Sequence, residues 1–589
     1  MTGTLQPLQR FFRLLQIDRK DIVYIYVYAV FAGLITLSLP LGVQAIIGLI
    51  AGGDMSASLV ILILIVTVAT ALAGILKVMQ LTVSETIQRR IFARSAFDFA
   101  YRVPRFKLES LTSEYAPELV NRFFDTLNLQ KGLPKILIDF STAVLQIIFS
   151  LILISFYHPF FVFFGIALMV ILLLIIRYTG PGGLKTSLKE SKYKYKVVYW
   201  LEEVARAMDT FKLAGKTPLP MKKTDDLVCN YLESRKAHFR ILLFQYGNIV
   251  AFKTIVTAGL LALGGYLVIN NQINIGQFVA AEIVVILVMN SVEKIILTME
   301  TIYDVLTALE KLGYVTDLPI EESEGMNFAQ IDSGEGLHIQ TSNLSYTFND
   351  SKKPAIKDLS LDIKPGERLC IAGYNGSGKS TLLKILAGLY LEHEGTVSYN
   401  GFASGSLDKE SLRGAIGDIC PEEDIFRGTI LDNIAMGNDD IDARQVMQAL
   451  RDVGLDPFIE QQKEGVQFEL LPGGSNVSRS VRTRMMVARA IVRQPMMLAV
   501  EGMFRGMETG DRLRFARLLA NRENPWTLIV VSDDPIMASH CDRILIMRRG
   551  QVVEEGNFDE LIHSEYFNAV FRTSDSMMLA KGVENLSAE

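Results

Sequence analysis

The stretch GYNGSGKST, residues 373–381, decides the fold of the second half of the chain. It matches the phosphate-binding pattern G-x-x-x-x-G-K-[ST] through Gly373, Gly378, Lys379 and Ser380. The apolar run LCIA precedes it and TLLKILA follows it, so the sequence predicts a buried strand, a glycine-rich loop and a helix in succession. This is the context in which the pattern binds the phosphates of a nucleotide.

The chemistry expected of the loop follows from its residue types. Glycine lets backbone N–H groups close on phosphate oxygens, and the N-terminus of the following helix adds positive potential. Lys379 is expected to reach the β and γ phosphates of ATP, and the Ser380 hydroxyl is expected to bind Mg²⁺. The expected ATP contacts of the loop are Gly373, Tyr374, Asn375, Gly376, Ser377, Gly378, Lys379, Ser380 and Thr381.

The first half of the chain is apolar. Half of the 589 residues are hydrophobic and the mean hydropathy is +0.27, while 21% are charged, which indicates an apolar portion joined to an ordinary soluble one. Six apolar runs can each cross about 30 Å of hydrocarbon, and we predict six membrane spans. The alternative for the short fourth and sixth runs is burial in a protein core. The runs are Ile22 to Ile50, Leu59 to Leu81, Ile136 to Tyr157, Phe160 to Ile176, Ile249 to Ile269 and Phe278 to Val292.

The placement of Lys and Arg predicts the orientation in the membrane. The short connections 51–58, 158–159 and 270–276 contain neither residue, whereas the N-terminal stretch RFFRLLQIDRK and the two long connections contain many. Both ends of the chain are therefore expected in the cytosol. The stretches ETIQRRIFARSAFDFAYRV and YKVVYWLEEVARAMDTFKLAG keep helical spacing, so the spans are expected to continue into the cytosol as long helices. A net charge of −5 argues against a nucleic-acid partner.

Two charged residues fall deep within the spans. At 1.5 Å per residue from the outer connection, Lys253 and Glu293 both lie roughly 25 Å deep and are placed to pair. A structural ion pair, or two side chains that reach the inner interface, stands against a role in the substrate path. Glu282 lies close to the outer end of its span and is expected to be reached by outer water.

These patterns predict the order of the domains. A cytosolic N-terminal segment (1–20), with no room for a folded domain, precedes an all-α transmembrane domain (21–316) of six helices with long cytosolic extensions. Residues 317–336 are acidic and aperiodic and are expected to be a linker. An α/β P-loop domain (337–572) and a C-terminal tail (573–589) are expected to follow.

Six spans, long cytosolic helices, a linker and then this loop resemble the ATP-binding cassette (ABC) exporters in their half-transporter form. LSYTF before the loop, GTVSYNG after it, IFRGTILDNIA, RTRMMVARAIVRQP and CDRILIMRRGQVVEEGNFDEL occur in the family's order. The resemblance implies ATP and Mg²⁺ as ligands, a second half-transporter as partner, membrane lipid around the spans, and the plasma (inner) membrane of a bacterium. It places Phe348 where the family stacks an aromatic ring on adenine. A core aromatic of a strand is the alternative for Phe348, and Tyr346 faces the same way.

The chain departs from the family pattern at the residues that hydrolyse ATP. Glu501 falls at the position of the Mg²⁺-binding aspartate, and Gly502 at that of the catalytic glutamate. Asp533 stands in place of the switch histidine, and Pro421 in place of the glutamine that senses γ-phosphate and metal. The resemblance therefore assigns metal contacts to Ser380 and Glu501, and no catalytic residue.

The signature that reads LSGGQ in the family is VSRSV here, residues 477–481, in which only Ser478 is kept as a nucleotide contact. The alternative register is PGGSN, residues 472–476. Arg479 puts a guanidinium where the family has bare backbone near the γ-phosphate, so it could bind phosphate or block it.

Loss of a general base typically costs about 10² to 10⁴ in rate, so we expect ATP binding with little hydrolysis. Three hypotheses follow. The chain is one half of a heterodimeric exporter whose partner hydrolyses ATP, a slow homodimeric exporter, or an ATP-sensing membrane scaffold. The sequence does not identify the substrate, although INIGQFVAAEIV is similar to the corresponding stretch of protein and peptide exporters.

Overall fold

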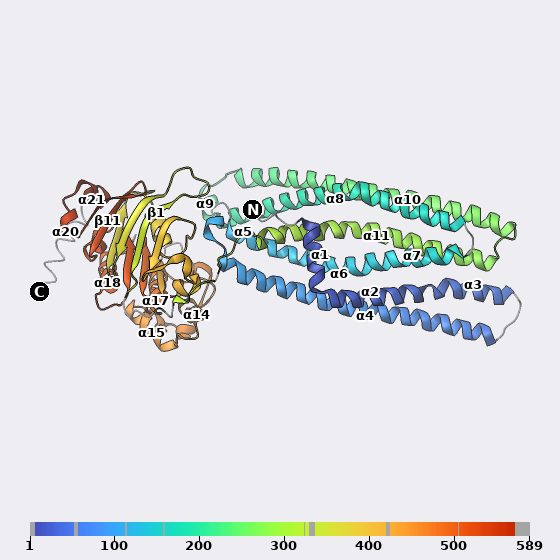
Figure 1. Ribbon diagram of the computed structural model, residues 1–589, viewed down its shortest axis with the longest axis horizontal. Helices are drawn as coiled ribbons and strands as arrows, with labels where there is room; N and C mark the ends of the chain where they lie inside the picture. The colour runs from blue at the N-terminus through green and yellow to red at the C-terminus, as the bar shows by residue number, and fades with distance from the viewer. Residues whose placement is uncertain are drawn as a thin grey trace. The chain divides into compact units, whose positions relative to one another are not determined.

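The computed structural model describes residues 6–51, 57–111, 115–156, 160–322, 324–328, 331, 336–419, 425–504 and 506–571, apart from a few side chains between 160 and 168. It forms two compact units (Figure 1). The first comprises Met1–Pro104 and Glu114–Leu318, and the second Arg105–Ser113 and Pro319–Glu589. Each unit has its own core.

The first unit is built from helices, four of which are very long and run side by side with their neighbours (Figure 1). At 1.5 Å per residue, the 46 residues of α4 extend about 69 Å, roughly twice the thickness of the hydrocarbon. The predicted continuation of spans as long helices is therefore confirmed. The helices are α1 (Pro7–Ile17), α2 (Arg19–Thr36), α3 (Ser38–Ala51), α4 (Ala57–Arg102), α5 (Ala116–Asn121), α6 (Asp125–Lys135), α7 (Ser141–Ser155), α8 (Phe160–Arg206), α9 (Met208–Leu213), α10 (Leu219–Ile269) and α11 (Ile275–Thr316).

Helical stretches long and apolar enough to span a membrane coincide with five of the six predicted spans, although the third stretch ends at Ser155, before the predicted Tyr157. The remaining predicted span, the fourth, Phe160 to Ile176, lies in α8, where several side chains fall outside the described residues. All-helical spans followed by a mixed α/β unit confirm the predicted fold class. The stretches found within the described part of the chain are Arg19–Ala51, Ala57–Arg105, Ala116–Ser155, Leu219–Ile269 and Ile275–Thr316.

Ion pairs link α11 to two neighbours within the spans. Lys253 on α10 pairs with Glu293, as predicted. The next residue, Lys294, pairs with Asp139 at 2.8 Å, which the sequence had not indicated. Asp139 lies in a π-helical turn, Ile136–Phe140, that follows Pro134 in α6. The π-helical turn places the Asp139 carboxylate within reach of Lys294 on α11.

The second unit contains a parallel sheet in the order β12-β11-β3-β10-β9-β6 and a smaller antiparallel sheet in the order β2-β1-β4-β5. Strands β3 and β10 are buried along their whole length, which explains why their sequences are continuously apolar rather than alternating. The strands of the larger sheet are β3 (Arg368–Gly373), β6 (Ile416–Ile419), β9 (Met497–Glu501), β10 (Thr527–Val531), β11 (Arg543–Arg548) and β12 (Gln551–Gly556), and those of the smaller are β1 (Ile339–Tyr346), β2 (Ile356–Ile363), β4 (Glu394–Tyr399) and β5 (Phe402–Ala403).

Short strands and helices complete this unit. The strand pair β7–β8 lies apart from both sheets, and the helices follow or connect the strands. These elements are β7 (Gly428–Thr429), β8 (Glu469–Leu470), α12 (Lys379–Leu386), α13 (Lys409–Gly414), α14 (Ile430–Ala435), α15 (Ala443–Asp452), α16 (Asp456–Gln461), α17 (Arg479–Ile491), α18 (Thr509–Ala520), α19 (Pro535–Ser539), α20 (Phe558–Leu561) and α21 (Glu565–Val570).

The segment 105–113, which follows α4 in the chain, belongs to the second unit. The buried Glu109 carboxylate accepts hydrogen bonds from the backbone N–H groups of Leu391 and Glu392, at 2.5 and 3.1 Å. Lys107 pairs with the Glu392 carboxylate at 2.9 Å, a hydrogen bond that raises the pKa of the lysine. Arg105 pairs with Glu410 at 2.6 Å.

The segment predicted as a linker, 317–336, begins at the division between the two units, which falls after Leu318. Part of it packs into the second unit, because Phe328 is buried against the smaller sheet's core and Glu321 pairs with Arg413. The predicted tail, 573–589, lies outside the described residues.

We expect Glu109→Ala to loosen the segment 105–111, because two backbone donors lose a charged acceptor at a cost of about 2 kcal/mol. Hydrogen exchange of the full-length protein in nanodiscs measures this as faster exchange at those amides. Glu394→Ala, an exposed acid on β4, is the control. Equal exchange in wild type and Glu109→Ala would show that the carboxylate does not hold the segment.

Candidate nucleotide-binding site

The loop between β3 and α12 takes the conformation that its glycines allow. Gly373 has φ of +145°, and a Cβ atom there would lie 2.3 Å from the Met547 carbonyl oxygen. Gly378, at the start of α12, has φ of +102°, and a Cβ atom there would lie 2.4 Å from the Ala355 carbonyl oxygen. Both positions therefore require glycine for conformation and for space. The loop delivers its backbone to the N-terminus of α12, as a phosphate site needs.

The side chains of the loop are placed for phosphate and metal. The Lys379 ammonium donates to the carbonyl oxygens of Gly373 and Tyr374, at 2.7 and 2.9 Å, and so lies over the loop. The Ser380 hydroxyl donates to the carboxylate of Glu501, the last residue of β9. This contact joins the two residues that the sequence analysis assigned to metal.

A cavity of about 1000 Å³ lies over the loop and is large enough for a nucleotide. It brings together ten of the twelve predicted nucleotide contacts: Phe348, Gly373, Asn375, Gly376, Ser377, Gly378, Lys379, Ser380, Thr381 and Glu501. Tyr374 instead lines a neighbouring cavity of about 450 Å³ with Arg548 and Tyr566. Ser478 lines neither cavity. Its hydroxyl accepts from the Val481 N–H at 3.3 Å and caps α17.

Phe348 and Tyr346 have different surroundings, although the sequence placed them on one side. Phe348 is half-buried and lines the cavity, whereas Tyr346 is 3% exposed. Burial raises the pKa of the Tyr346 phenol well above its usual range. Tyr346 stacks on Tyr390 with ring centroids 5.2 Å apart, and Phe348 meets both rings edge-on at 5.0 and 5.9 Å. The stacked tyrosines therefore pack against the Phe348 ring.

The aromatic group also adjoins the segment 105–113. Tyr390 directly precedes Leu391 and Glu392, whose N–H groups hold the Glu109 carboxylate. The aromatic group beside the cavity and the segment that follows α4 thus both contact one short stretch of chain, 390–392. Nothing in the sequence pattern of Tyr390 indicated this role.

Gly502 has a backbone conformation that suits glycine. Its φ is +63°, the left-handed region, where an L-residue costs roughly 1–2 kcal/mol. It follows Glu501 directly and lines the cavity. No carboxylate stands at this position, and a substituted side chain would have to overcome the backbone strain.

The remaining wall comes from the segment after β10 and from α18. Asp534 is buried, accepts from the Ile536 N–H at 2.8 Å and pairs with Arg512 at 2.9 Å. Asp533 is exposed and lines the cavity, while His540 does not line it and hydrogen-bonds the Ile536 carbonyl. Asp533, which the family resemblance places at the position of the switch histidine, therefore faces the cavity. Pro421 lies outside the described residues.

Arg479, the first residue of α17, also lines the cavity and is exposed. Its guanidinium lies near the backbone of Gly506, 3.6 Å from where a Cβ atom would stand. Several further lining residues were missed by the sequence analysis: Lys384, Phe504, Gly506, Met507, Arg512, Val570 and Phe571. Lys384 lies on α12, one turn beyond the loop. The others belong to no motif that the sequence analysis used and come from parts of the chain far from the loop.

The residues present fit a magnesium nucleotide rather than a metal held by protein alone. Within the described ranges, no group of three or more His, Cys, Asp or Glu side chains could hold a metal ion. Mg²⁺ commonly takes one or two protein oxygens and completes its shell with phosphate oxygens and water. Ser380 and Glu501 would supply those protein oxygens, and the metal would supply charge neutralisation at the phosphates.

Comparison with known families identifies both parts of the chain. Residues 22–292 match the family model described as ABC transporter transmembrane region. Residues 356–501 match the family model described as ABC transporter. The chain belongs to the ABC transporter family. One transmembrane region and one nucleotide-binding domain in a single chain make this ABC transporter a half-transporter and a multi-pass integral membrane protein.

Individual relatives agree with this assignment. The ABC transporter is 28% identical over 371 residues to the alpha-hemolysin translocation ATP-binding protein HlyB of Escherichia coli O157:H7, which covers 62% of the chain and 51% of HlyB. It is 27% identical over 370 residues to the exotoxin translocation ATP-binding protein PaxB of Pasteurella aerogenes, with the same coverage. The chain thus spans about half the length of these curated relatives.

A solved structure shares the fold. A bacterial Atm1-family ABC exporter with ATP bound superposes with a TM-score of 0.83, covering 94% of this chain and 97% of that one at 18% sequence identity. At this identity the likeness concerns the fold alone.

We expect Phe348→Ala to weaken ATP binding about tenfold, because stacking of a base on an aromatic ring contributes roughly 1–3 kcal/mol. Calorimetric titration of the purified full-length protein measures the change. Phe402→Ala, a half-buried phenylalanine of the same unit that does not line the cavity, is the matched control. Unchanged affinity for ATP in Phe348→Ala would contradict stacking on adenine and would favour the alternative, that Phe348 is an aromatic residue of the core.

Proposed function

We propose that this ABC half-transporter binds MgATP in the cavity over residues 373–381 and hydrolyses it slowly or not at all, while a partner half supplies most of the hydrolysis. The observation that carries the proposal is the combination of a complete phosphate loop with Gly502 beside Glu501. Binding residues are present, and glycine stands at the position where the family resemblance places the catalytic glutamate.

The proposed roles follow from the contacts. The loop N–H groups and Lys379 hold the phosphates, Ser380 and Glu501 hold Mg²⁺, and Phe348 stacks on adenine. Bound ATP would supply binding energy that joins two nucleotide-binding domains. Without a general base, the rate of ATP hydrolysis is expected to fall by a factor of about 10² to 10⁴, which corresponds to a barrier about 3–5.5 kcal/mol higher.

In this proposal the transporter is an exporter, with both ends and the nucleotide-binding domain in the cytosol of a bacterium. The names of the relatives HlyB and PaxB refer to translocation of a hemolysin and an exotoxin, which favours a polypeptide substrate. The pairs Lys253–Glu293 and Lys294–Asp139 neutralise Glu293 and Lys294 of α11, so we assign these two pairs to structure rather than to the substrate path.

A heterodimer is favoured over a homodimer. In a homodimer, both sites would combine Gly502 with the altered signature of residues 477–481, and neither would be complete. The heterodimer has a difficulty too. This chain would contribute its phosphate loop and Gly502 to one site and its altered signature to the other, so both sites would be weakened. An ATP-sensing scaffold without transport is the second candidate function, and it is favoured by the same weakened signature.

The purified protein should bind ATP and show near-zero turnover, since it has the loop but not the base. Titration with ATP and release of phosphate measure the two properties separately. Lys379→Ala should remove binding, because it deletes the cation over the loop. Rapid hydrolysis that Lys379→Ala abolishes would contradict the proposal. Turnover that appears only on adding a competent half would favour the exporter over the scaffold.

Gly502→Glu should leave turnover within about tenfold of wild type, because its left-handed backbone disfavours the new side chain and Asp533 remains in place of histidine. Gly510→Glu, in an open position on α18, controls for the added charge. The combined variant Gly502→Glu, Asp533→His and Pro421→Gln should hydrolyse faster than any single one. A hundredfold gain from Gly502→Glu alone would show that only the base was missing.

A further inference from the structure

Helix α1 is fixed to the end of α11 by one ion pair. The Arg10 guanidinium contacts the Asp317 carboxylate at 3.1 and 2.5 Å, and its side chain is only 11% exposed. Gly313 makes room for it, since a Cβ atom there would lie 2.2 Å from the guanidinium. The helix that precedes the first span is therefore held in a definite place on its own unit.

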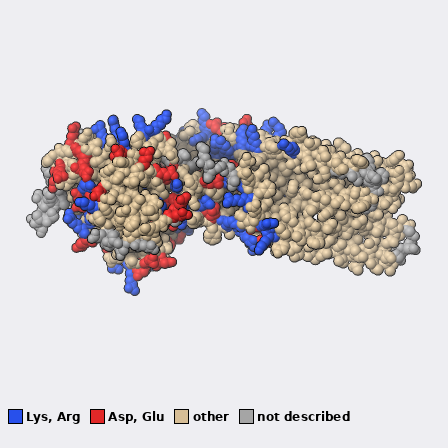
Figure 2. Space-filling view, in the orientation of Figure 1, with Lys and Arg blue, Asp and Glu red and all other residues tan. Residues whose placement is uncertain are grey.

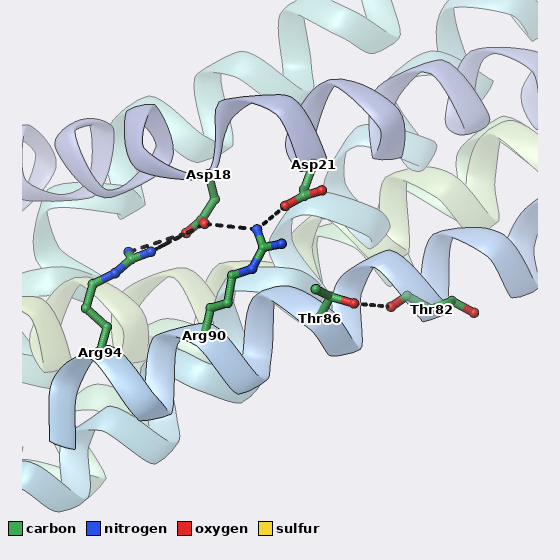
Figure 3. A network of polar contacts seen from close by, with 6 residues as sticks. All are labelled: Asp18, Asp21, Thr82, Thr86, Arg90 and Arg94. Atoms are coloured by element: carbon green, nitrogen blue, oxygen red, sulfur yellow. Dashed lines mark hydrogen bonds and ion pairs between the residues drawn. The ribbon is translucent and has the colours of Figure 1, made fainter. Parts of the chain in front are cut away.

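A second network fixes the other end of α1, at its junction with α2 (Figure 3). Asp18 is buried and pairs with Arg94 at 3.4 Å and with Arg90 at 3.7 Å, both on α4. Arg90 also pairs with Asp21 in the first turn of α2. The two aspartates of this corner are thus neutralised from within the protein.

Three cations of the α1–α2 corner, residues 7–24, take no part in the two ion-pair networks just described. Arg13, Arg19 and Lys20 are exposed, and none of them has an ion pair in the described part of the chain. They lie at the border where the first span begins. On the face drawn in Figure 2, Lys and Arg of the first unit gather beside a surface that is almost entirely uncharged. The corner therefore presents a net positive charge at the level of the lipid headgroups.

The outward surface of α1 is divided lengthwise. At 100° per residue, Leu8, Phe12 and Leu15 form an apolar strip, and Gln9, Arg13 and Gln16 form a polar strip beside it. Leu8 and Phe12 are 52% and 60% exposed, so the strip is not covered by protein. It leads to the exposed apolar side chains of α2, namely Val23, Tyr24, Val27 and Phe31.

We propose that the α1–α2 corner binds anionic phospholipid of the cytosolic leaflet. The strip of Leu8, Phe12 and Leu15 lies among the upper acyl chains, as the outward face of α2 does, and Arg13, Arg19 and Lys20 contact the headgroups. Continuity with the membrane-spanning surface identifies lipid as the occupant, and the uncompensated cations select its charge. Because Arg10 ties α1 to the end of α11, occupancy of this site bears on that end of the helix.

Tryptophan quenching tests the position of the strip. Leu8→Trp and Gln9→Trp place a fluorophore on neighbouring strips, and nanodiscs of acyl-brominated phosphatidylcholine quench only residues that enter the hydrocarbon. After subtraction of Trp200 and Trp526 by means of the wild type, Leu8→Trp should be quenched about twofold and Gln9→Trp far less. Equal quenching of the two, or none in Leu8→Trp, would overturn the proposed orientation.

Lipid selectivity tests the headgroup contacts. Each cation near a membrane surface contributes about 1 kcal/mol, which is about fivefold in association. The triple variant Arg13→Gln, Arg19→Gln and Lys20→Gln should therefore lose at least about fivefold in the association of spin-labelled phosphatidylglycerol relative to phosphatidylcholine. Lys352→Gln, Lys353→Gln and Lys357→Gln, three exposed residues of the second unit, remove the same charge and should change nothing.

Salt dependence of the wild type gives a measurement that needs no variant. Raising the salt concentration should abolish the preference for phosphatidylglycerol, because exposed charges are screened. A preference that persists in the triple variant, or that is absent from the wild type at low salt, would overturn the proposal. Neither result depends on whether ATP is hydrolysed, so the test is independent of the proposed function.

Discussion

Parallel pairing of β3, β10 and β9 is the constraint on which the nucleotide site depends. Val531 of β10 pairs with Ile371 of β3 on one side and with Glu501 of β9 on the other. Three segments far apart in the sequence therefore leave the sheet at the same edge: the phosphate loop, the Glu501–Gly502 pair and Asp533–Asp534. Parallel strands place their carboxyl ends together, and this edge is where open α/β sheets bind ligands. The contact between Ser380 and Glu501 is a direct consequence of the register.

Sequence reasoning succeeded where a local pattern carries the physics. The loop follows from glycines at fixed spacing, and the long helices follow from apolar runs that backbone hydrogen bonding in hydrocarbon forces to be helical. Pairing of Lys253 with Glu293 follows from equal depth. Lys294 pairs with Asp139, which lies in a π-helical turn, and a depth count along regular helices contains no such information.

The parts of the site that escaped prediction depend on tertiary contacts. Tyr346 ends β1 and Phe348 follows it two residues later, yet only the packing against Tyr390 decides which of them is buried. Arg512 on α18 and Phe571, which follows α21, line the cavity from segments that carry no motif. The left-handed backbone of Gly502 is likewise a property of the turn after β9, whereas the sequence revealed only that a carboxylate was missing.

Because residues 105–113 complete a unit whose other residues begin at Pro319, that unit is discontinuous along the chain. During translation, its first piece leaves the ribosome long before the remainder, and roughly 200 residues of membrane-inserting helix separate the two. Glu109 and Phe106 are therefore synthesised before their partners, Leu391 and Glu392 for Glu109 and Ile320 for Phe106. A recombinant fragment that begins at residue 319 would therefore lack residues 105–113, and with them the Glu109 carboxylate that the N–H groups of Leu391 and Glu392 contact.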